Sequence, residues 1–430
     1  MVADLSAGIS GANTVWVLLG AAMVMFMTVP ALGMFYGGLV KKKNVLNIMM
    51  QSFICLGVVS LIWVAFGYSL AFSDSELIPG VLGDFHWAFL NGINPMDPSP
   101  YYVSDAKGRI PHLAFVLFQC MFAVITPAVI SGAMAERMKF SAYLAYVILW
   151  SVIIYIPLTH MVWSHNGFLA KMGIADFAGG TVVEINSGFS ALAAALYIGR
   201  RRNLKSVPPH DLTYTLAGAA MLWFGWFGFN AASGLAADGL AAQAFLNTNV
   251  AAAAAACVWA ALDKIFQKRP TILGFATGGV AGLVGITPAA GFVGLAGAMA
   301  IGVAAGLVCF FMVVFVKGKL RYDDSLDAFG VHGVAGVLGT LGTGLFANPA
   351  ITRGFAFGGD AGIAGAFYGN LNLLGVQAIG VLVAMVMAFG GTLALFWVID
   401  LFRGVRVSEK EEAIGLDITQ HNERAYTVIE

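Results

Sequence analysis

Charged side chains are the scarcest class of residue in this 430-residue sequence. Only 11% of the residues are Asp, Glu, Lys or Arg, whereas a soluble globular chain carries about 25%. So few charges cannot cover a water-facing surface of this size, which argues against a soluble enzyme and against a disordered chain. The formal net charge is zero, so no basic field attracts nucleic acid, and we expect no nucleic-acid partner.

Cysteine is equally rare, and the four residues of this type all lie inside apolar stretches: Cys55, Cys120, Cys257 and Cys309. We expect them to be buried as small hydrophobic side chains, with no disulfide or metal framework. The sequence also lacks nucleophile-elbow, metal-binding and phosphate-loop motifs. We therefore expect no enzyme activity, no cofactor and no bound metal.

Hydrophobic side chains are abundant, at 59% of the chain, and the mean hydropathy is +0.82. A helix that spans a bilayer needs about 20 mostly apolar residues, and only helices and closed barrels can span. The apolar stretches predict an all-α polytopic protein of the lipid bilayer with eleven transmembrane helices. They cover roughly 14–40, 45–72, 112–135, 140–160, 178–199, 211–234, 245–265, 271–288, 292–316, 326–347 and 372–402.

Basic residues alternate between the loops that these helices define. Nineteen of the 23 Lys and Arg residues fall in one set of loops, and the other set holds only Lys107, Arg109, Lys171 and Arg353. Because cytoplasmic loops are enriched in Lys and Arg, we predict an outer N-terminus and a cytoplasmic C-terminus. Residues 1–402 would form the transmembrane domain, in a plasma or inner cell membrane, and residues 403–430 a cytoplasmic tail.

Ten of the eleven predicted helices divide into five plus five, which predicts an inverted repeat followed by a final helix. The fifth helix opens with Asp176 and reaches Glu184, and the tenth opens with Asp327 and reaches His332. At about 1.5 Å per residue, each ionisable side chain lies roughly 10 Å inside a core about 30 Å thick. Glu184 and His332 can therefore approach each other near the middle of the membrane.

Ionisable residues within membrane spans are costly, so Glu184 and His332 are functional candidates. The alternatives are a protonated, hydrogen-bonded glutamic acid and a satisfied core histidine. Asp176 and Asp327 fit helix N-caps as well as they fit a functional role.

Phe122, Trp163, Phe229 and Ser233 fall near the outer ends of the third, fourth and sixth helices. Aromatic faces attract cations by about 0.5–2 kcal/mol, so a ring cluster with a hydroxyl group can recruit a small cation. Taken singly, each ring fits an interfacial aromatic belt better.

The chain resembles the ammonium transporter family (Amt/Mep/Rh), and its Amt/Mep branch more than the Rh branch. The likeness runs from the first helix to the tail in matching order. The matching stretches are 119–126, 135–138, 159–163, 176–183, 225–230, 281–289, 327–336 and 415–417.

The resemblance implies a homotrimer with one pore per subunit and ammonium or ammonia as the substrate. It implies that Phe122, Trp163 and Ser233 form an outer ammonium-recruitment site, beside which Asp176 is a structural acid. It also implies that Phe122 and Phe229 are the stacked rings that gate the pore.

The pore midpoint of the family usually carries two facing histidines, and His332 matches the second. Glu184 stands where the first histidine is usual, although a minority of members, including some fungal ones, also carry an acid there. In the family's usual mechanism ammonium loses its proton at the aromatic gate, ammonia crosses an apolar pore, and the histidines relay the proton. Our hypothesis is a mixed Glu184–His332 relay with net electrogenic uptake.

The tail motif at 415–417 and the Ala425–Tyr426 ending resemble the surface that docks a PII-type signalling protein in bacterial members. We therefore expect a PII-type protein as a possible cytoplasmic partner. Two other functions remain open from the sequence. They are an ammonium sensor with little flux and a passive gas channel for ammonia or carbon dioxide.

Overall fold

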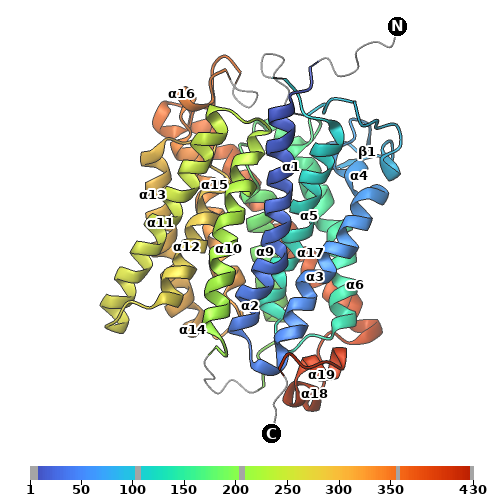
Figure 1. The fold of residues 1–430 in the computed structure, drawn as a ribbon, viewed down its shortest axis with the longest axis vertical. Coiled ribbons are helices and arrows are strands. Elements are labelled where there is room, and N and C mark those ends of the chain that lie inside the picture. The colour runs from blue at the N-terminus through green and yellow to red at the C-terminus, as the bar shows by residue number, and fades with distance from the viewer. Residues whose placement is uncertain (1–7, 102–107, 203–208, 355–358, 427–430) are drawn as a thin grey trace.

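The computed structural model describes residues 8–101, 108–202, 209–354 and 359–426. Long helices run side by side along the longest axis of the molecule (Figure 1). Lys107 and Lys205, two of the basic residues behind the orientation prediction, lie outside the described residues.

Within these ranges, nine helical runs are long and apolar enough to cross a membrane. They are Gly11–Leu39 (α1, Gly11–Phe26; η1, Met27–Leu32; α2, Gly33–Leu39), Lys42–Phe72 (η2, Lys42–Asn44; α3, Val45–Ile62; η3, Trp63–Gly67; α4, Tyr68–Phe72), His112–Met134 (α5), Phe140–Met172 (α6, Phe140–Trp150; η5, Ser151–Tyr155; α7, Ile156–Trp163; α8, Phe168–Met172), Gly180–Ile198 (η6, Gly180–Ile185; α9, Asn186–Ile198), Gly239–Gln267 (α11), Leu295–Leu320 (α13, Leu295–Phe311; η8, Met312–Val316; α14, Lys317–Leu320), Phe329–Phe346 (η9, Phe329–Gly333; α15, Val334–Phe346) and Leu371–Arg403 (α17).

The two remaining predicted spans, 211–234 and 271–288, correspond to α10 (Leu212–Ala231) and α12 (Ile272–Ile286). Both helices stand in the same bundle (Figure 1), but α12 has only 15 residues and α10 is not among the nine long apolar runs. The count of eleven spans therefore stays a prediction.

Polar residues at the helix starts explain several of these boundaries. The carboxylate of Asp211 accepts the Tyr214 N–H at the start of α10, and the hydroxyl of Thr271 accepts the Gly274 N–H at the start of α12. Each cap satisfies one of the backbone donors that the first turn of a helix leaves without a partner.

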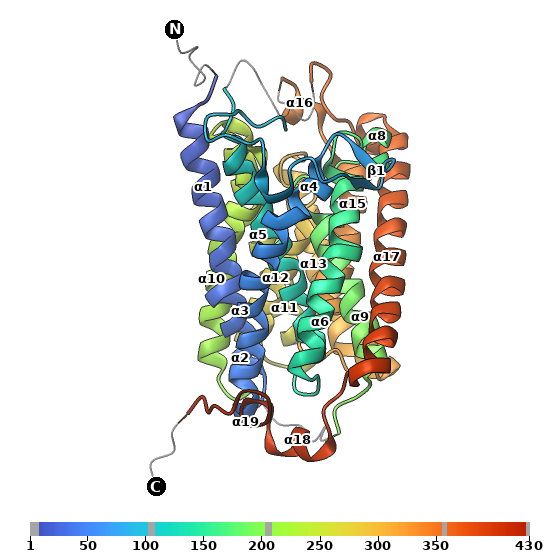
Figure 2. The same ribbon diagram turned by 90° about the vertical axis from the view of Figure 1, so that its right-hand side faces the viewer.

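The two ends of the molecule carry different parts of the chain. The start of α1, the hairpin β1 (Glu76–Ile78) and β2 (Leu82–Gly83), the turns η4 (Ala88–Leu90) and η10 (Ala366–Tyr368), and α16 (Pro349–Thr352) lie towards one end (Figures 1 and 2). The tail helices α18 (Glu409–Ile414) and α19 (Leu416–His421) lie at the other end. The chain therefore crosses the bundle an odd number of times, and which end faces the cytoplasm stays a prediction.

The tail packs against the helix ends above it. The Leu416 N–H donates to Asn44 Oδ1 at 2.8 Å, and the Asn47 N–H donates to Asp417 Oδ1 at 2.8 Å. The η7 turn (Ala232–Gly234) closes the opposite end of α10. The domain boundary at 402/403 is a prediction that the contacts do not decide.

One cysteine differs from the expectation. Cys55, Cys120 and Cys309 are buried, but Cys257 is exposed. Cys257 lies on α11, where only 39% of the most apolar 18-residue window is buried inside the chain. An apolar stretch in a membrane helix predicts contact with lipid as readily as contact with protein, so hydrophobic surroundings did not imply burial.

Candidate functional site

Glu184 and His332 meet in the interior of the bundle. His332 Nδ1 lies 2.7 Å from Glu184 Oε2, which is the length of a charge-assisted hydrogen bond. Glu184 is 1% exposed and His332 is 6% exposed. An acid and an imidazole that share one hydrogen bond can pass a proton between them.

Each of the two residues sits in a π-helical turn whose start is held by an aspartate eight residues earlier in the chain. Asp176 Oδ1 accepts the N–H groups of Gly179 and Gly180 at 2.9 and 2.6 Å, and Oδ2 accepts those of Thr181 and Val182 at 2.9 and 3.3 Å. One buried carboxylate thus satisfies four backbone donors of the turn that carries Glu184.

Asp324 plays the same part for His332, and sequence reasoning missed it. Asp324 Oδ1 accepts the Ala328 N–H at 3.1 Å, and Oδ2 accepts the N–H groups of Phe329 and Gly330 at 2.8 and 3.4 Å. Burial raises the pKa of Asp324 and the neighbouring Asp327 raises it further, while Lys317 opposes both. The shared spacing of eight residues between cap and ionisable side chain is the sequence signal that could have found Asp324.

Of the two roles that the sequence left open for Asp327, the helix cap is wrong. Its side chain forms an ion pair with Lys317, and its backbone lies in the left-handed region with φ of 60°. The reason is that Asp324, three residues earlier, already occupies the capping position.

The helix α9, which continues the turn that carries Glu184, meets the π-helical turn of His332 backbone to backbone. A Cβ atom placed on Gly188 would lie 2.1 Å from the Gly333 nitrogen and 2.2 Å from its Cα. Only glycine allows this approach. Glu184 lies four residues before Gly188 and His332 lies directly before Gly333, so this close contact helps to hold the two side chains within hydrogen-bond distance.

Aromatic rings cover one approach to this pair. The ring centroids of Phe122 and Phe229 are 4.4 Å apart with 40° between the ring planes. Trp163 stands edge-on to Phe122 at 5.9 Å, and its Nε1–H donates to the Asp176 carbonyl oxygen at 3.0 Å. The Asp176 region thus fixes both the Glu184 turn and the outer indole.

A small cavity of about 10 Å³ lies on the side of the rings away from Glu184 and His332, lined by Gln119, Phe122, Trp163, Phe177, Ser233 and Leu235. The Ser233 hydroxyl donates to the Phe229 carbonyl oxygen at 2.7 Å, so its oxygen lone pairs can accept from a guest. Gln119, which sequence reasoning missed, adds an amide oxygen with no hydrogen-bond partner in the described part of the chain. Its position one helical turn before Phe122 is the signal that points to the same face.

Two more cavities lie beside Glu184 and His332. One of about 10 Å³ has mainly apolar walls and reaches from Phe229 to Glu184 and His332. The next, of about 60 Å³, runs from His332 to Asp327 and shares His332, Phe35 and Val280 with the first. A volume of about 10–15 Å³ holds one water-sized molecule. The three spaces are therefore a candidate path for small molecules past the buried pair, in which the Phe122 and Phe229 rings separate the first space from the second.

Ion pairs brace the end of the bundle beyond this path. Arg201 bridges Glu136 and Asp323 at 2.7 and 3.0 Å. Burial acts to raise the pKa of Glu136, but Arg201 and three hydrogen bonds outweigh it and hold that pKa below its ordinary value. Arg137, which is fully buried, donates to the carbonyl oxygens of Ala133 and Asp323 at 2.8 and 2.6 Å. These contacts tie the loop before Asp324 to the first half of the chain.

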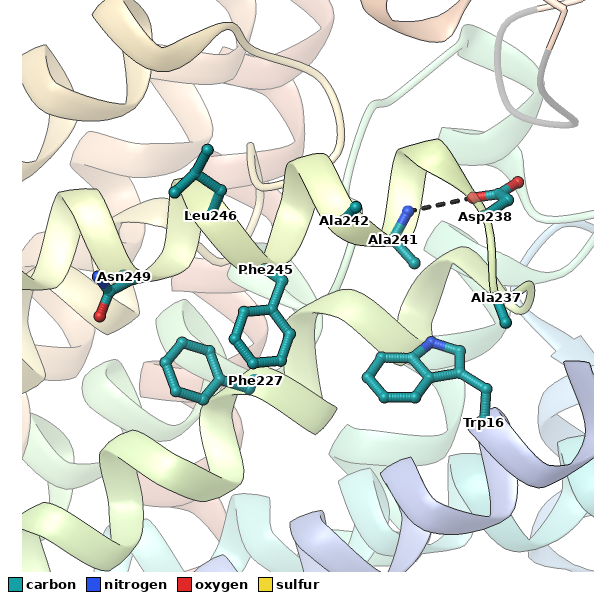
Figure 3. A pocket seen from close by; sticks show the side chains of 9 residues that line it. All are labelled: Trp16, Phe227, Ala237, Asp238, Ala241, Ala242, Phe245, Leu246 and Asn249. Atoms are coloured by element: carbon teal, nitrogen blue, oxygen red, sulfur yellow. Dashed lines mark hydrogen bonds between the residues drawn. The ribbon is translucent and has the colours of Figure 1, made fainter. Parts of the chain in front are cut away.

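A cavity of about 660 Å³ is not part of this path. It lies between α1, α10 and α11, and Figure 3 shows Trp16, Phe227 and Phe245 along it. Its one acid, Asp238, accepts the Ala241 N–H at 3.1 Å as the cap of α11. No group of three or more His, Cys, Asp or Glu side chains within the described ranges is placed to hold a metal ion.

The fold and the site together define a multi-pass helical membrane protein with small cavities beside a buried acid–imidazole pair. The sequence matches the Ammonium Transporter Family over residues 15–426. The chain belongs to this family.

Individual relatives agree with this assignment. An ammonium transporter of Bacillus subtilis is 45% identical over 414 residues, which cover 96% of this chain and 98% of the relative. The crystal structure of Saccharomyces cerevisiae Mep2 superposes with a TM-score of 0.86 at 32% identity, covering 95% of this chain and 90% of that one. A solved structure named "Sensor Amt Protein" superposes with a TM-score of 0.84 at 29% identity, covering 95% and 98%.

Proposed function

We propose that this protein transports ammonium across the plasma or inner membrane of the cell. The observation that carries the proposal is the 2.7 Å contact between Glu184 and His332, placed between two small cavities that lead towards opposite ends of the molecule. The family of the chain supplies the substrate, and the relatives that share most of its length carry the name ammonium transporter.

The outer cavity is suited to recruit the ammonium cation. Phe122 and Trp163 offer ring faces and edges, and Ser233 and Gln119 offer oxygen acceptors. Cation–π attraction is worth about 0.5–2 kcal/mol. Ammonium can donate N–H hydrogen bonds to the oxygens and to the ring faces, whereas a potassium ion has no hydrogen to donate and interacts with both only as a point charge.

The cavity beyond Phe229 favours the neutral form of the substrate. Because its walls are apolar apart from Glu184 and His332, a charged guest would lose its hydration without full replacement, which is strongly unfavourable. Ammonium therefore gives up its proton as it passes the Phe122–Phe229 pair, and ammonia enters. Because the rings cannot take up a proton, the acceptor is the ionised carboxylate of Glu184, which lines the same cavity as Phe229. The proton passes along the Glu184–His332 pair, so that ammonia plus proton amounts to net electrogenic uptake.

The test is ammonium-evoked current in liposomes that contain the purified protein, for the unaltered chain and for Glu184→Ala and His332→Ala. Each variant removes one member of the relay, so we expect a reduced current and a changed preference for ammonium over potassium. Unchanged current and unchanged selectivity in both variants would overturn the relay.

A sensor with little flux is the second candidate function, because a solved structure named "Sensor Amt Protein" shares the fold. The same recording separates the candidates. A sustained current supports transport, a transient current supports sensing, and no current with rapid alkalinisation inside the liposome supports a passive gas channel.

We also infer a homotrimer and a PII-type partner at the tail end. The apolar cavity between α1, α10 and α11 offers a surface for subunit contact (Figure 3), and native mass spectrometry that finds only monomers would contradict the trimer. Retention of a PII protein that is lost after truncation beyond Arg406 would support docking on the tail. Binding that is indifferent to the truncation would count against the tail.

A further inference from the structure

A large cavity lies away from the pore, at the end of the bundle that carries the tail. Its volume is about 580 Å³, and its walls come from the segment between α2 and α3 and from the tail. Figure 2 shows the tail helices α18 and α19 at this end of the bundle. The lining residues are Lys41, Lys42, Lys43, Ile414, Asp417, Ile418, Arg424, Ala425 and Tyr426.

The charges around this cavity are unbalanced. Four of the lining side chains are cationic and one, Asp417, is acidic. The Asp417 carboxylate is 2% exposed and accepts the backbone N–H of Asn47, so it is turned towards α3 and held there.

Two of these cations, Lys42 and Lys43, contact an aromatic ring and backbone carbonyl oxygens. Lys42 lies 5.1 Å from the ring centroid of Tyr426, and the Lys43 ammonium donates to the carbonyl oxygens of Glu412 and Ala413. Neither lysine nor Arg424 forms an ion pair with an acid in the part of the chain that the structure describes. Crowded like charges repel one another, and an anion between them relieves that repulsion.

We propose that this cavity binds a phosphate group, independently of the transport path. Lysine ammonium groups bind phosphate as point charges and arginine binds it through its planar fork. The Tyr426 hydroxyl, held 3.0 Å from His210 Nε2, adds a polar group to the wall. Ile414 and Ile418 provide an apolar side for the rest of the ligand.

Two sources can supply the phosphate, and position favours a lipid. The lysines follow directly after the apolar run Gly11–Leu39, which places them at the depth of lipid headgroups, where basic clusters bind anionic lipids. A bound phosphate would bridge the first loop on this side and the tail, adding to the contacts that hold the tail against α3.

The experiment compares the full-length protein with the double variant Lys42→Gln/Arg424→Gln. The matched control is Lys268→Gln/Arg269→Gln, which removes the same two charges from the exposed loop between α11 and α12. Binding of short-chain phosphatidylglycerol, phosphatidylcholine and soluble glycerol phosphate is measured by native mass spectrometry, and the thermal unfolding midpoint confirms that each variant folds.

We expect the unaltered protein and the control to retain phosphatidylglycerol over phosphatidylcholine, and the cavity variant to bind it about 30-fold more weakly. Loss of glycerol phosphate binding in the cavity variant alone, without lipid binding, supports the site with a soluble ligand. Equal losses in both variants, or no phosphate ligand bound by the unaltered protein, would overturn the proposal. Binding of poly-glutamate without any phosphate ligand would also overturn it, in favour of an acidic protein partner.

Discussion

Replacing Asp176 by asparagine should destabilise the protein by an amount that follows from its hydrogen bonds. The carboxylate accepts four backbone N–H groups, two on each oxygen. Asparagine keeps one acceptor oxygen and turns an NH₂ group towards the other two donors. Each buried donor left without a partner costs about 1–3 kcal/mol, so the loss should be about 2–6 kcal/mol.

Two other aspartates turn this prediction into a graded series. Asp324 places two acceptor contacts on Oδ2 and one on Oδ1, so Asp324→Asn strands one donor and should cost about 1–3 kcal/mol. Asp211 accepts both of its partners, Thr213 Oγ1 and the Tyr214 N–H, on Oδ1 alone. Asp211→Asn keeps both bonds and should cost less than about 0.5 kcal/mol, because Asn and Asp are comparable caps.

The assay is unfolding of the detergent-purified variants, followed by tryptophan fluorescence, with ammonium flux measured in parallel. We expect stability to fall in the order Asp211→Asn, Asp324→Asn, Asp176→Asn. Flux should fall with the last two, because these caps place His332 and Glu184. Equal stability of Asp176→Asn and Asp211→Asn would refute the assignment of Asp176 as the anchor of the Glu184 turn.

Two further predictions concern packing and pH. Gly188→Ala should destabilise the protein by about 1–3 kcal/mol or more and reduce flux, because the added methyl group meets the Gly333 backbone. Gly375→Ala, which meets nothing within 4 Å, is the control, and equal unfolding midpoints would contradict the contact. Acidification should loosen the tail, since burial lowers the pKa of His421 and its ring lies 2.9 Å from Asn47 Nδ2. The contact between the tail and α3 is strongest above about pH 6.5, the ordinary pKa of histidine. It weakens as the pH falls towards the lowered pKa of His421. Hydrogen exchange of the tail at pH 7.5 and pH 5.5 measures this, and a response unchanged by His421→Asn would contradict it.

The sequence was sufficient to predict the helical membrane fold, because hydrophobic runs of spanning length are rare in proteins that do not cross a bilayer. The sequence was less reliable for the number of membrane spans and for the side of a helix that faces lipid. α12 spans only 15 residues, and the apolar setting of Cys257 did not distinguish lipid from protein contact.

The candidate site also contains residues whose proximity the sequence predicted and residues, Asp324 among them, that it missed. The inverted repeat placed Glu184 and His332 at similar depth, and the structure puts them 2.7 Å apart, although their role in transport stays a prediction. Asp324 was not chosen over Asp327, because both acids precede the same helix and the eight-residue spacing that Asp324 shares with Asp176 went unused. The choice is made by backbone geometry, since only Asp324 reaches the free N–H groups of Ala328 and Phe329.

The contribution of Gln119 likewise depends on three-dimensional placement. Glutamine in an apolar helix has no fixed meaning in a sequence. Its amide oxygen becomes informative only when it lines a cavity with Trp163 and Ser233 and has no partner among the described residues.

The most direct measurement of the central claim is the ammonium-evoked current of Glu184→Gln in proteoliposomes between pH 5.5 and pH 8. Glutamine keeps the size of the side chain and can still hydrogen-bond to His332, but it cannot take up or release a proton. If the pair carries the proton, the current should fall about 100-fold or more, while the protein remains folded. A current of normal size with the pH dependence of the unaltered protein would contradict a proton relay through Glu184 and His332.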